Sequence, residues 1–174
     1  IGKLPAHTLV MSRRRQGREL ALGCLYAHFS TGEPVETVFE GQSRRMTTDA
    51  ETASYAHRLF ASAVEHGEEI DRLIRESSVN WDFARIGQIE KNILRLAIAE
   101  LKFCLETPAA VAINEALELA RDYAAEESRS FINAVLDRVY KGGNAAAGDG
   151  AKGTDSESAD GPPGIRNPQL PNEG

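Results

Sequence analysis

Residues 80–101, NWDFARIGQIEKNILRLAIAEL, decide the fold class of this chain. Asp82 is suited to cap a short turn, and a helical pattern follows that turn. Apolar side chains then recur at the three- and four-residue spacing that places them on one side of an α-helix: Ile89, Ile93, Leu96, Ala97 and Leu101. This is the strongest such pattern in the sequence. It predicts a helix that packs its apolar face into a core.

Helical patterns of the same kind cover most of the remaining sequence. Ser12 is a candidate N-cap for a first helix, which residues 31–34 (TGEP) should end. Asp49 is a candidate cap for a long third helix that contains Gly67, although an internal glycine weakens a helix. The last helix is expected to close at residues 142–143, both of them glycine. Since no segment alternates with the two-residue period of a strand, the chain is predicted to be all-α.

The chain has 174 residues and a net charge of −6, which is enough length for one domain with a sizeable core. We expect a flexible N-terminal extension over residues 1–11, a helical domain over residues 12–141, and a disordered Gly/Pro-rich acidic tail over residues 142–174. The tail has no aromatic residue and too few apolar ones to offset the entropy of ordering. No apolar run is long enough to span a membrane.

Two cysteines, Cys24 and Cys104, lie far apart within apolar helical patterns. We interpret them as buried free thiols of a protein in a reducing cytosol, in preference to a disulfide or a redox pair. A cytoplasmic location is therefore expected.

Residues 12–20, SRRRQGREL, place four arginines at the expected start of the first helix of an otherwise acidic chain. A helix N-terminus favours anions, and positive side chains there oppose the helix dipole. Such a pattern indicates selection for an anionic ligand, although a solvated basic helix end without function explains the spacing equally well. The four arginines are Arg13, Arg14, Arg15 and Arg18, and the spacing lets Arg18 share a face with Arg14 or Arg15.

Signatures of catalysis are absent from the sequence. It has no glycine-rich phosphate loop, no nucleophile elbow and no dinucleotide-binding fingerprint, and its four histidines share no metal-ligand spacing. Polar residues inside apolar helices, such as Glu100 and Glu115, are interpreted as hydrogen-bonded joints between helices. The chain is predicted not to be an enzyme and to need no cofactor and no metal.

Three segments taken together resemble one known family: residues 13–29 (RRRQGRELALGCLYAHF), residues 80–101, and residues 111–140 (VAINEALELARDYAAEESRSFINAVLDRVY). They are similar to the N-utilisation substance B (NusB) family of transcription antitermination factors. The resemblance implies about seven helices in two small antiparallel bundles. It also implies binding to a single-stranded RNA element called BoxA and to NusE, which is also a small-subunit ribosomal protein. This assembly belongs to an antitermination complex on RNA polymerase that suppresses premature termination in ribosomal RNA operons.

The resemblance also implies roles for individual residues. It favours the arginine run as a set of phosphate contacts, and Arg121 could reach a further phosphate. Tyr26 and Tyr123 fall on family positions near the RNA or partner surface, where an aromatic ring can stack on a base, with a half-buried core tyrosine as the alternative for each. Glu90 matches a position linked with NusE. The predicted RNA-binding residues are Arg13, Arg14, Arg15, Arg18, Arg121 and Tyr123, and the predicted partner-binding residues are Tyr26, Glu90, Lys91 and Arg95.

Some positions depart from the family pattern, and two other functions remain open. Ala124 and Ala134 stand where family members often have glycine, so the loop before the last helix should be less bent. Ser130 stands where a lysine is common, which leaves open one phosphate contact that the resemblance implies. The chain could instead be the RNA-binding domain of an RNA methyltransferase, or a protein–protein scaffold whose arginines meet an acidic partner. Both a monomer and a homodimer fit the sequence.

Overall fold

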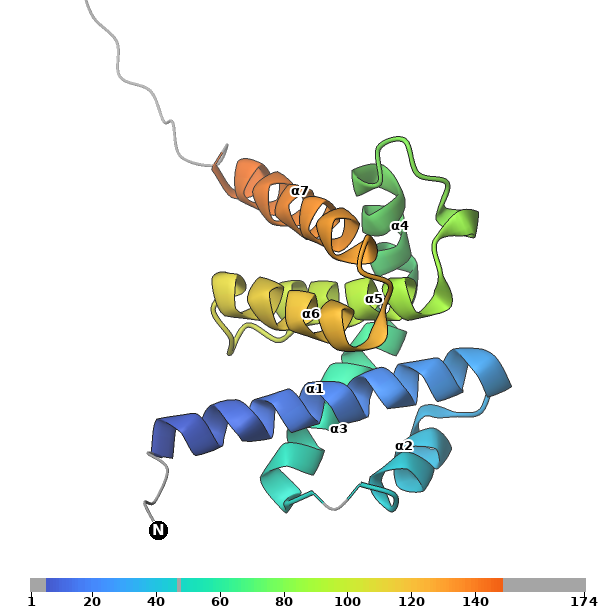
Figure 1. Ribbon diagram of the computed structural model, residues 1–174, viewed down its shortest axis with the longest axis vertical. Helices are drawn as coiled ribbons and strands as arrows, with labels where there is room; N and C mark the ends of the chain where they lie inside the picture. Colours follow the sequence, from blue (N-terminus) through green and yellow to red (C-terminus); the bar gives the residue numbers. More distant parts are fainter. Residues whose placement is uncertain (1–5, 47, 149–174) are drawn as a thin grey trace, which may run out of the picture.

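The computed structural model describes residues 6–46 and 48–148, and every regular element within them is helical (Figure 1). This confirms the predicted all-α class. Residues 1–5 of the predicted extension and residues 149–174 of the predicted tail lie outside the described residues. The elements are α1 (Ala6–Thr31), α2 (Val35–Ser43), α3 (Ala50–Glu65), α4 (Gly67–Ser77), the 3₁₀ turn η1 (Phe83–Arg85), α5 (Gln88–Phe103), α6 (Ala109–Tyr123) and α7 (Ser128–Gly148).

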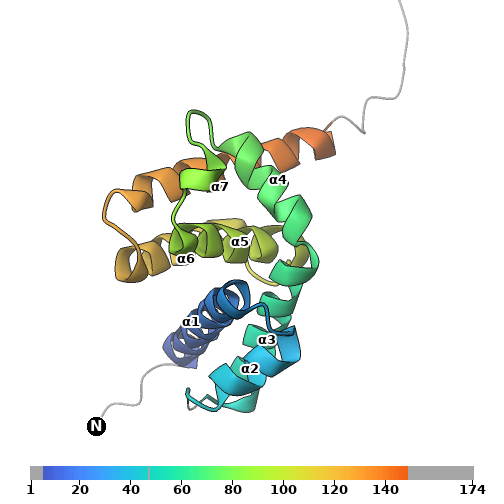
Figure 2. The same ribbon diagram turned by 90° about the vertical axis from the view of Figure 1, so that its right-hand side faces the viewer.

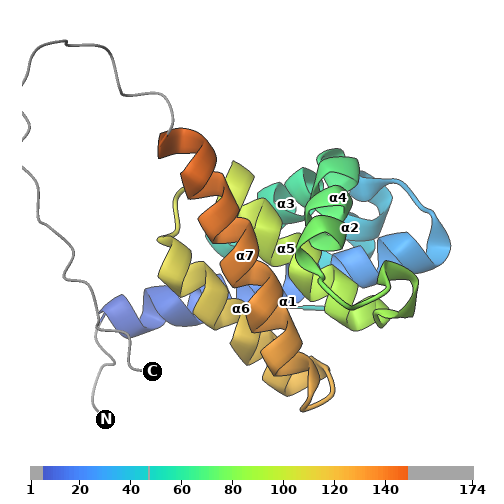
Figure 3. The same cartoon turned by 90° about the horizontal axis from the view of Figure 1, so that it is seen from above.

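The helices form two small bundles, as predicted. Helices α1, α2 and α3 make the first, and α4 to α7 make the second (Figure 2). Helix α7 lies across α5 and α6 (Figure 3), and α4 packs against α5 and α7. Helix α5 joins the bundles, because it also packs against α1 and α3.

Helix α5 is the centre of the core. All residues from position 92 to position 100 are buried, so the helix is enclosed on every side along this length. The sequence pattern indicated one apolar face, but a helix between two bundles must bury its other faces as well. Its polar side chains at Asn92, Arg95 and Glu100 are therefore also buried, and each makes hydrogen bonds to another side chain.

Three predicted helix ends are confirmed. The carboxylate of Asp49 accepts a hydrogen bond from Thr52 N at 3.0 Å and caps α3, and that of Asp82 accepts one from Ala84 N at 3.0 Å and caps η1. Helix α1 ends just before Gly32, whose φ of 72° is a left-handed conformation that glycine adopts without a steric cost.

Three other boundaries differ from the prediction. Helix α1 begins at Ala6, not after Ser12, because residues 6–12 contain neither glycine nor proline to stop it. The long third helix is two helices that meet at His66, where the chain turns so that α4 can reach α7. Helix α7 continues past residues 142–143 to Gly148, since glycine weakens a helix without necessarily ending it and three alanines follow at residues 145–147.

Both cysteines are free thiols, as expected. Cys24 is fully buried in the core, and burial raises the pKa of its thiol to about 12. Cys104 is partly buried, and burial raises its pKa as well. Neither thiol is activated as a nucleophile, because only the thiolate form is reactive.

Candidate nucleic-acid interface

The three consecutive arginines Arg13, Arg14 and Arg15, which we call the arginine surface, lie on α1 between α3 and α6. They begin seven residues after the first residue of α1, which is about two helical turns. The field of a helix dipole fades within the first turn, so the predicted role of the helix N-terminus in binding phosphate is wrong here. The side chains themselves carry the positive charge of this surface.

Each arginine of this surface pairs with acidic side chains from other elements. Arg13 contacts Asp49 at 3.4 Å and Glu51 at 3.5 Å, at the start of α3. Arg14 contacts Glu106, in the loop between α5 and α6, at 3.2 Å. Their side chains remain 50% and 31% exposed, respectively, so a ligand can reach both guanidinium groups.

Arg15 faces the other side of α1 and joins it to the end of α6. Its guanidinium contacts Asp122 at 2.6 Å and Glu19 at 3.1 Å. Arg121 also binds Asp122, at 3.0 Å. The hydrogen bond from Arg121 and the charge of Arg15 hold the pKa of Asp122 below its ordinary value. Tyr123 follows directly and is 51% exposed, so the structure places Arg15, Arg121 and Tyr123 close together at the end of α6.

Arg18 is not part of this surface, which corrects the prediction that it contacts RNA. The residue is 3% exposed and donates two hydrogen bonds to Glu100, at 2.9 and 2.7 Å, and one to Glu115 at 3.3 Å. Burial is the largest single effect and lowers the pKa of Arg18, but the hydrogen bond and charge of Glu100, together with the charges of Tyr55 and Glu115, raise that pKa above its ordinary value. Glu100 and Glu115 are joints between helices, as predicted. Arg18 belongs to the same contact between helices, since its guanidinium is hydrogen-bonded to these buried carboxylates.

Arg95 is also buried, which removes it from the predicted partner surface. It is 6% exposed and binds Asp71 of α4 through two hydrogen bonds, at 2.7 and 2.8 Å. Its guanidinium lies 3.9 Å from the centroid of the Phe29 ring on α1. One arginine thus holds α4, α5 and α1 together, and its donors face the protein interior.

The remaining predicted partner residues are accessible to different degrees. Tyr26 is 50% exposed on α1. Glu90 is partly buried and accepts a hydrogen bond from Ser128 Oγ at 2.8 Å, which ties the first turn of α5 to that of α7. Lys91 is partly buried, with its ammonium group 4.7 Å from the centroid of the Phe83 ring. The structure does not link these three side chains by any hydrogen bond or ion pair.

The departures from the family pattern fit the backbone that the structure shows. Ala124 ends α6 in an extended conformation, with φ of −110° and ψ of 174°, so no glycine is required there. Ser130 donates a hydrogen bond to the Glu127 carbonyl at 3.1 Å, within the first turn of α7. Among the described residues other than glycine, Asn80 alone has a positive φ.

Sequence reasoning missed several residues beside the arginine surface. Arg58, on α3, binds the same Glu106 carboxylate as Arg14 does. Tyr55, one helical turn before Arg58, carries the guanidinium of Arg14 over its ring. The spacing of Tyr55 and Arg58 indicates a shared helix face, but no sequence signal places a loop residue such as Glu106 between two helices.

A second missed feature is an aromatic pair in which one ring is exposed. Trp81 is 58% exposed and tilts against Phe131, with the ring centroids 4.9 Å apart. An apolar sequence pattern predicts core packing, so it gives no signal for an aromatic ring that stays on the surface.

Other kinds of site are not found in the part of the chain that the structure describes. No group of three or more His, Cys, Asp or Glu side chains there is placed to hold a metal ion. No helix over residues 6–46 and 48–148 is both long and apolar enough to cross a membrane.

The fold and the arginine surface define a small all-helical protein with partly exposed arginine side chains on one helix. A model of the NusB family matches residues 15–141, and the chain belongs to that family. It is 40% identical over 133 residues to the transcription antitermination protein NusB of Myxococcus xanthus, covering 74% of this chain and 95% of the relative. The corresponding protein of Desulfotalea psychrophila is 41% identical over 135 residues, covering 74% and 96%.

Solved structures agree with this assignment. A crystal structure of the antitermination factors NusB and NusE in complex with double-stranded RNA matches with a TM-score of 0.70 and 31% identity. It covers 76% of this chain and 98% of the matched one. T. maritima NusB matches with a TM-score of 0.66 and 32% identity, over 74% of this chain and 90% of the other.

Proposed function

We propose that this protein is a transcription antitermination factor that binds single-stranded BoxA-type RNA together with NusE. In this role it joins the antitermination complex on RNA polymerase and suppresses premature termination in ribosomal RNA operons. The observation that carries the proposal is the family match over residues 15–141, with relatives that are themselves named transcription antitermination proteins. Since the function acts on transcribing RNA polymerase, the proposed location is the cytoplasm.

The arginine surface supports the proposed binding of single-stranded RNA. Binding of single-stranded RNA needs cations along the backbone and exposed rings on which bases stack. Arg13 and Arg14 offer accessible guanidinium groups on one side of α1, and Arg15 and Arg121 lie beside the exposed ring of Tyr123 on the other. We assign RNA contact to these five residues.

The proposed binding of NusE rests on two observations. One is the complex of NusB and NusE among the structural neighbours, and the other is an accessible surface of this chain. Tyr26 presents an exposed ring, and Glu90 and Lys91 lie on the first turn of α5. We assign contact with NusE to these three residues.

The test is a binding titration with a fluorescently labelled BoxA-type oligoribonucleotide, with and without NusE from the same source. We expect binding that is weaker for a scrambled RNA and for duplex DNA, and that becomes tighter when NusE is present. Equal affinity for all three nucleic acids, unchanged by NusE, would contradict the proposal.

The other two functions are less well supported. The chain covers 95% of the length of the M. xanthus relative, which leaves little room in that relative for a methyltransferase domain. A scaffold that binds only acidic proteins would fail to bind RNA in the same titration. Antitermination therefore remains the proposed function.

A further inference from the structure

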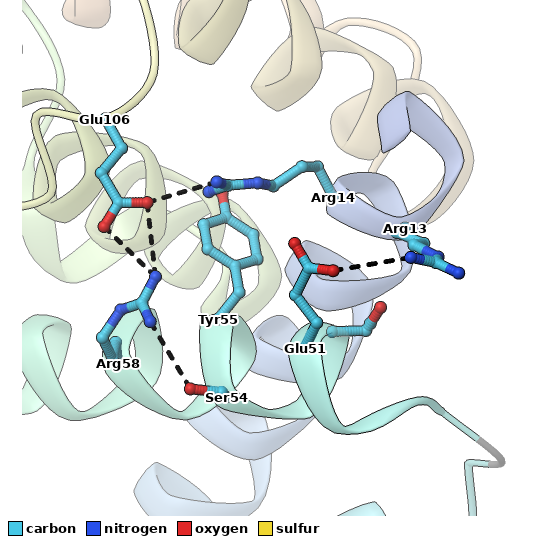
Figure 4. Close-up of a pocket in the computed structure, with 8 residues that line it drawn as sticks. Arg13, Arg14, Glu51, Ser54, Tyr55, Arg58 and Glu106 are labelled. Carbon is cyan, nitrogen blue, oxygen red and sulfur yellow. Dashed lines mark hydrogen bonds and ion pairs between the residues drawn. The ribbon is translucent and has the colours of Figure 1, made fainter. Parts of the chain in front are cut away.

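A pocket of about 270 Å³ lies between α1 and α3, and the loop between α5 and α6 closes it (Figure 4). Two arginines from different helices converge there on one carboxylate. Arg14 Nη2 contacts Glu106 Oε2 at 3.2 Å, and Arg58 Nη2 contacts Glu106 Oε1 at 3.2 Å and Oε2 at 3.3 Å. The carboxylate of Glu106 thus lies between the two guanidinium groups.

The guanidinium of Arg14 is held in place but keeps a free donor. It lies over the ring of Tyr55, 4.3 Å from the centroid, and the Tyr55 hydroxyl is itself fixed by a 2.6 Å hydrogen bond to Glu100. Arg14 Nη1 is enclosed and has no hydrogen-bond partner among the described residues. Arg14 is therefore oriented in advance, and it keeps hydrogen-bonding capacity that Glu106 does not use.

Glu106 is a replaceable occupant of this position. It belongs to a short loop, and its side chain is 55% exposed. Ion pairs at such exposure contribute little to stability, so exchanging one anion for another there has a small cost. A phosphodiester group also carries one negative charge on two terminal oxygens, so it can take the place of the carboxylate between two guanidinium groups.

We propose that Arg14 and Arg58 form a phosphate-binding site that Glu106 occupies in the free protein, and that a backbone phosphate of bound RNA displaces Glu106. This inference rests on the proposed function. It adds Arg58 to the RNA-binding residues and extends the RNA path from α1 onto α3. It also makes Glu106 an internal competitor that weakens RNA binding.

The test compares two pairs of variants in the RNA titration. Glu106→Gln removes the competitor and should tighten binding by about two- to fivefold. Arg58→Gln should weaken binding and flatten the plot of log affinity against log salt by about 0.7. Glu40→Gln and Arg44→Gln are matched controls, because these residues form a similar exposed ion pair at the C-terminal end of α2, 3.4 Å apart, and should change neither quantity.

Three outcomes would overturn the inference in distinguishable ways. If Arg14→Gln weakens RNA binding while the Glu106 and Arg58 variants behave like their controls, this site is wrong and the proposed function stands. If the wild-type protein binds no RNA, both fail. Inorganic phosphate at matched ionic strength distinguishes the ligand source: phosphate that binds the wild type but not Arg58→Gln, and that leaves RNA affinity unchanged, would assign the pocket to free phosphate and overturn the RNA assignment.

Discussion

At the residue scale, Arg14 and Arg18 are residues of the same type, four positions apart on α1, that have different roles. Both guanidinium groups lie over the ring of Tyr55, 5.7 Å from its centroid for Arg18 and 4.3 Å for Arg14. Arg18 is enclosed by Glu100 and Glu115, whereas Arg14 lies at the edge of a pocket. The two arginines lie on the same face of α1. They differ in how deeply the side chain is buried, which makes Arg18 structural and leaves Arg14 accessible.

Replacing Arg18 by methionine should destabilise the protein strongly. The change leaves the carboxylates of Glu100 and Glu115 buried without their cation, and breaking a buried pair in this way costs about 3–5 kcal/mol. Urea denaturation followed by circular dichroism measures the loss. Arg13→Met is the control, since Arg13 is half exposed and its loss should be far smaller. Equal losses for the two variants would contradict the assignment of Arg18 to the core.

Glu100 should make the stability of the protein depend on acid pH. Burial raises its pKa, but the hydrogen bond and charge of Arg18 and the hydrogen bonds of Tyr55 and Thr107 together lower the pKa of Glu100 below its ordinary value. Its stabilisation is therefore complete above the pKa of unfolded glutamate, about 4.3, and is lost as pH falls toward the lower pKa of the folded state.

The measurement compares the free energy of unfolding of wild type and Glu100→Gln between neutral pH and this acid range. The advantage of the wild type should shrink as pH falls. A constant difference would show that Glu100 does not titrate with a lowered pKa.

Replacing Arg13, Arg14 and Arg15 together by alanine should weaken RNA binding and its salt dependence. Each phosphate that the protein neutralises on a single strand contributes about −0.7 to the slope of log affinity against log salt, so removing all three arginines should flatten the slope by about 2. The melting temperature should fall slightly, because the variant lacks the ion pairs to α3, α6 and the loop between α5 and α6. If the variant is folded and keeps the wild-type slope, these arginines do not contact RNA phosphates.

Tyr123→Ala should weaken RNA binding by a different physical route. Loss of a stacked ring costs about 1–3 kcal/mol of affinity and releases few ions, so the salt slope should stay unchanged. The same titration series measures both quantities. An altered slope with unchanged affinity at low salt would contradict a stacking role for Tyr123.

At the element scale, the contact between α1 and α3 depends on one glycine. A Cβ atom at Gly17 would lie 2.5 Å from Cδ1 of Tyr55, so the ring of Tyr55 can lie against α1 only because position 17 has no side chain. The same ring supports Arg14 at the pocket. Packing of two helices thus determines the position of a candidate ligand contact.

Gly17→Ala should therefore destabilise the protein by about 1–3 kcal/mol, the usual cost of overpacking a core. Gly23→Ala is a matched control on the same helix, because its nearest neighbour, Gln42 Oε1, is 4.0 Å away. That change should stabilise the protein by about 0.5–1 kcal/mol, since alanine is the better helix former. Thermal or urea unfolding measures both, and effects of the same sign would contradict this account.

At the scale of the whole molecule, buried arginines join the two bundles. Arg18 on α1 binds Glu100 on α5, and Arg95 on α5 binds Asp71 on α4 while it stacks on Phe29 of α1. The proposed RNA-binding residues lie on α1 and α6, and those for NusE lie on α1 and α5. Helix α1 therefore carries residues for both ligands.

We expect RNA and NusE to bind more tightly together than separately. Because coupling between two ligands is reciprocal, the factor by which NusE tightens RNA binding must equal the factor by which RNA tightens NusE binding. Isothermal titration in both orders measures the two factors. Identical RNA dissociation constants with and without NusE would contradict coupling.

The sequence alone determined the helical class, most of the helices, the caps at Asp49 and Asp82, and the resemblance to the NusB family. These features are local, because a hydrogen bond to a cap or an apolar period involves residues only a few positions apart. The interpretation of Glu100 and Glu115 as joints between helices was correct for a similar reason, since a polar residue in an apolar stripe needs a partner.

Only the tertiary structure decided which arginines are accessible to a ligand. The partners of Arg18, Arg14 and Arg15 lie 82, 92 and 107 positions away in the chain. No local pattern specifies such pairs, because they exist only once α1 lies against α3, α5 and α6. The same packing places Arg58 and Glu106 beside Arg14, and it buries Arg95, which sequence position alone had assigned to a partner.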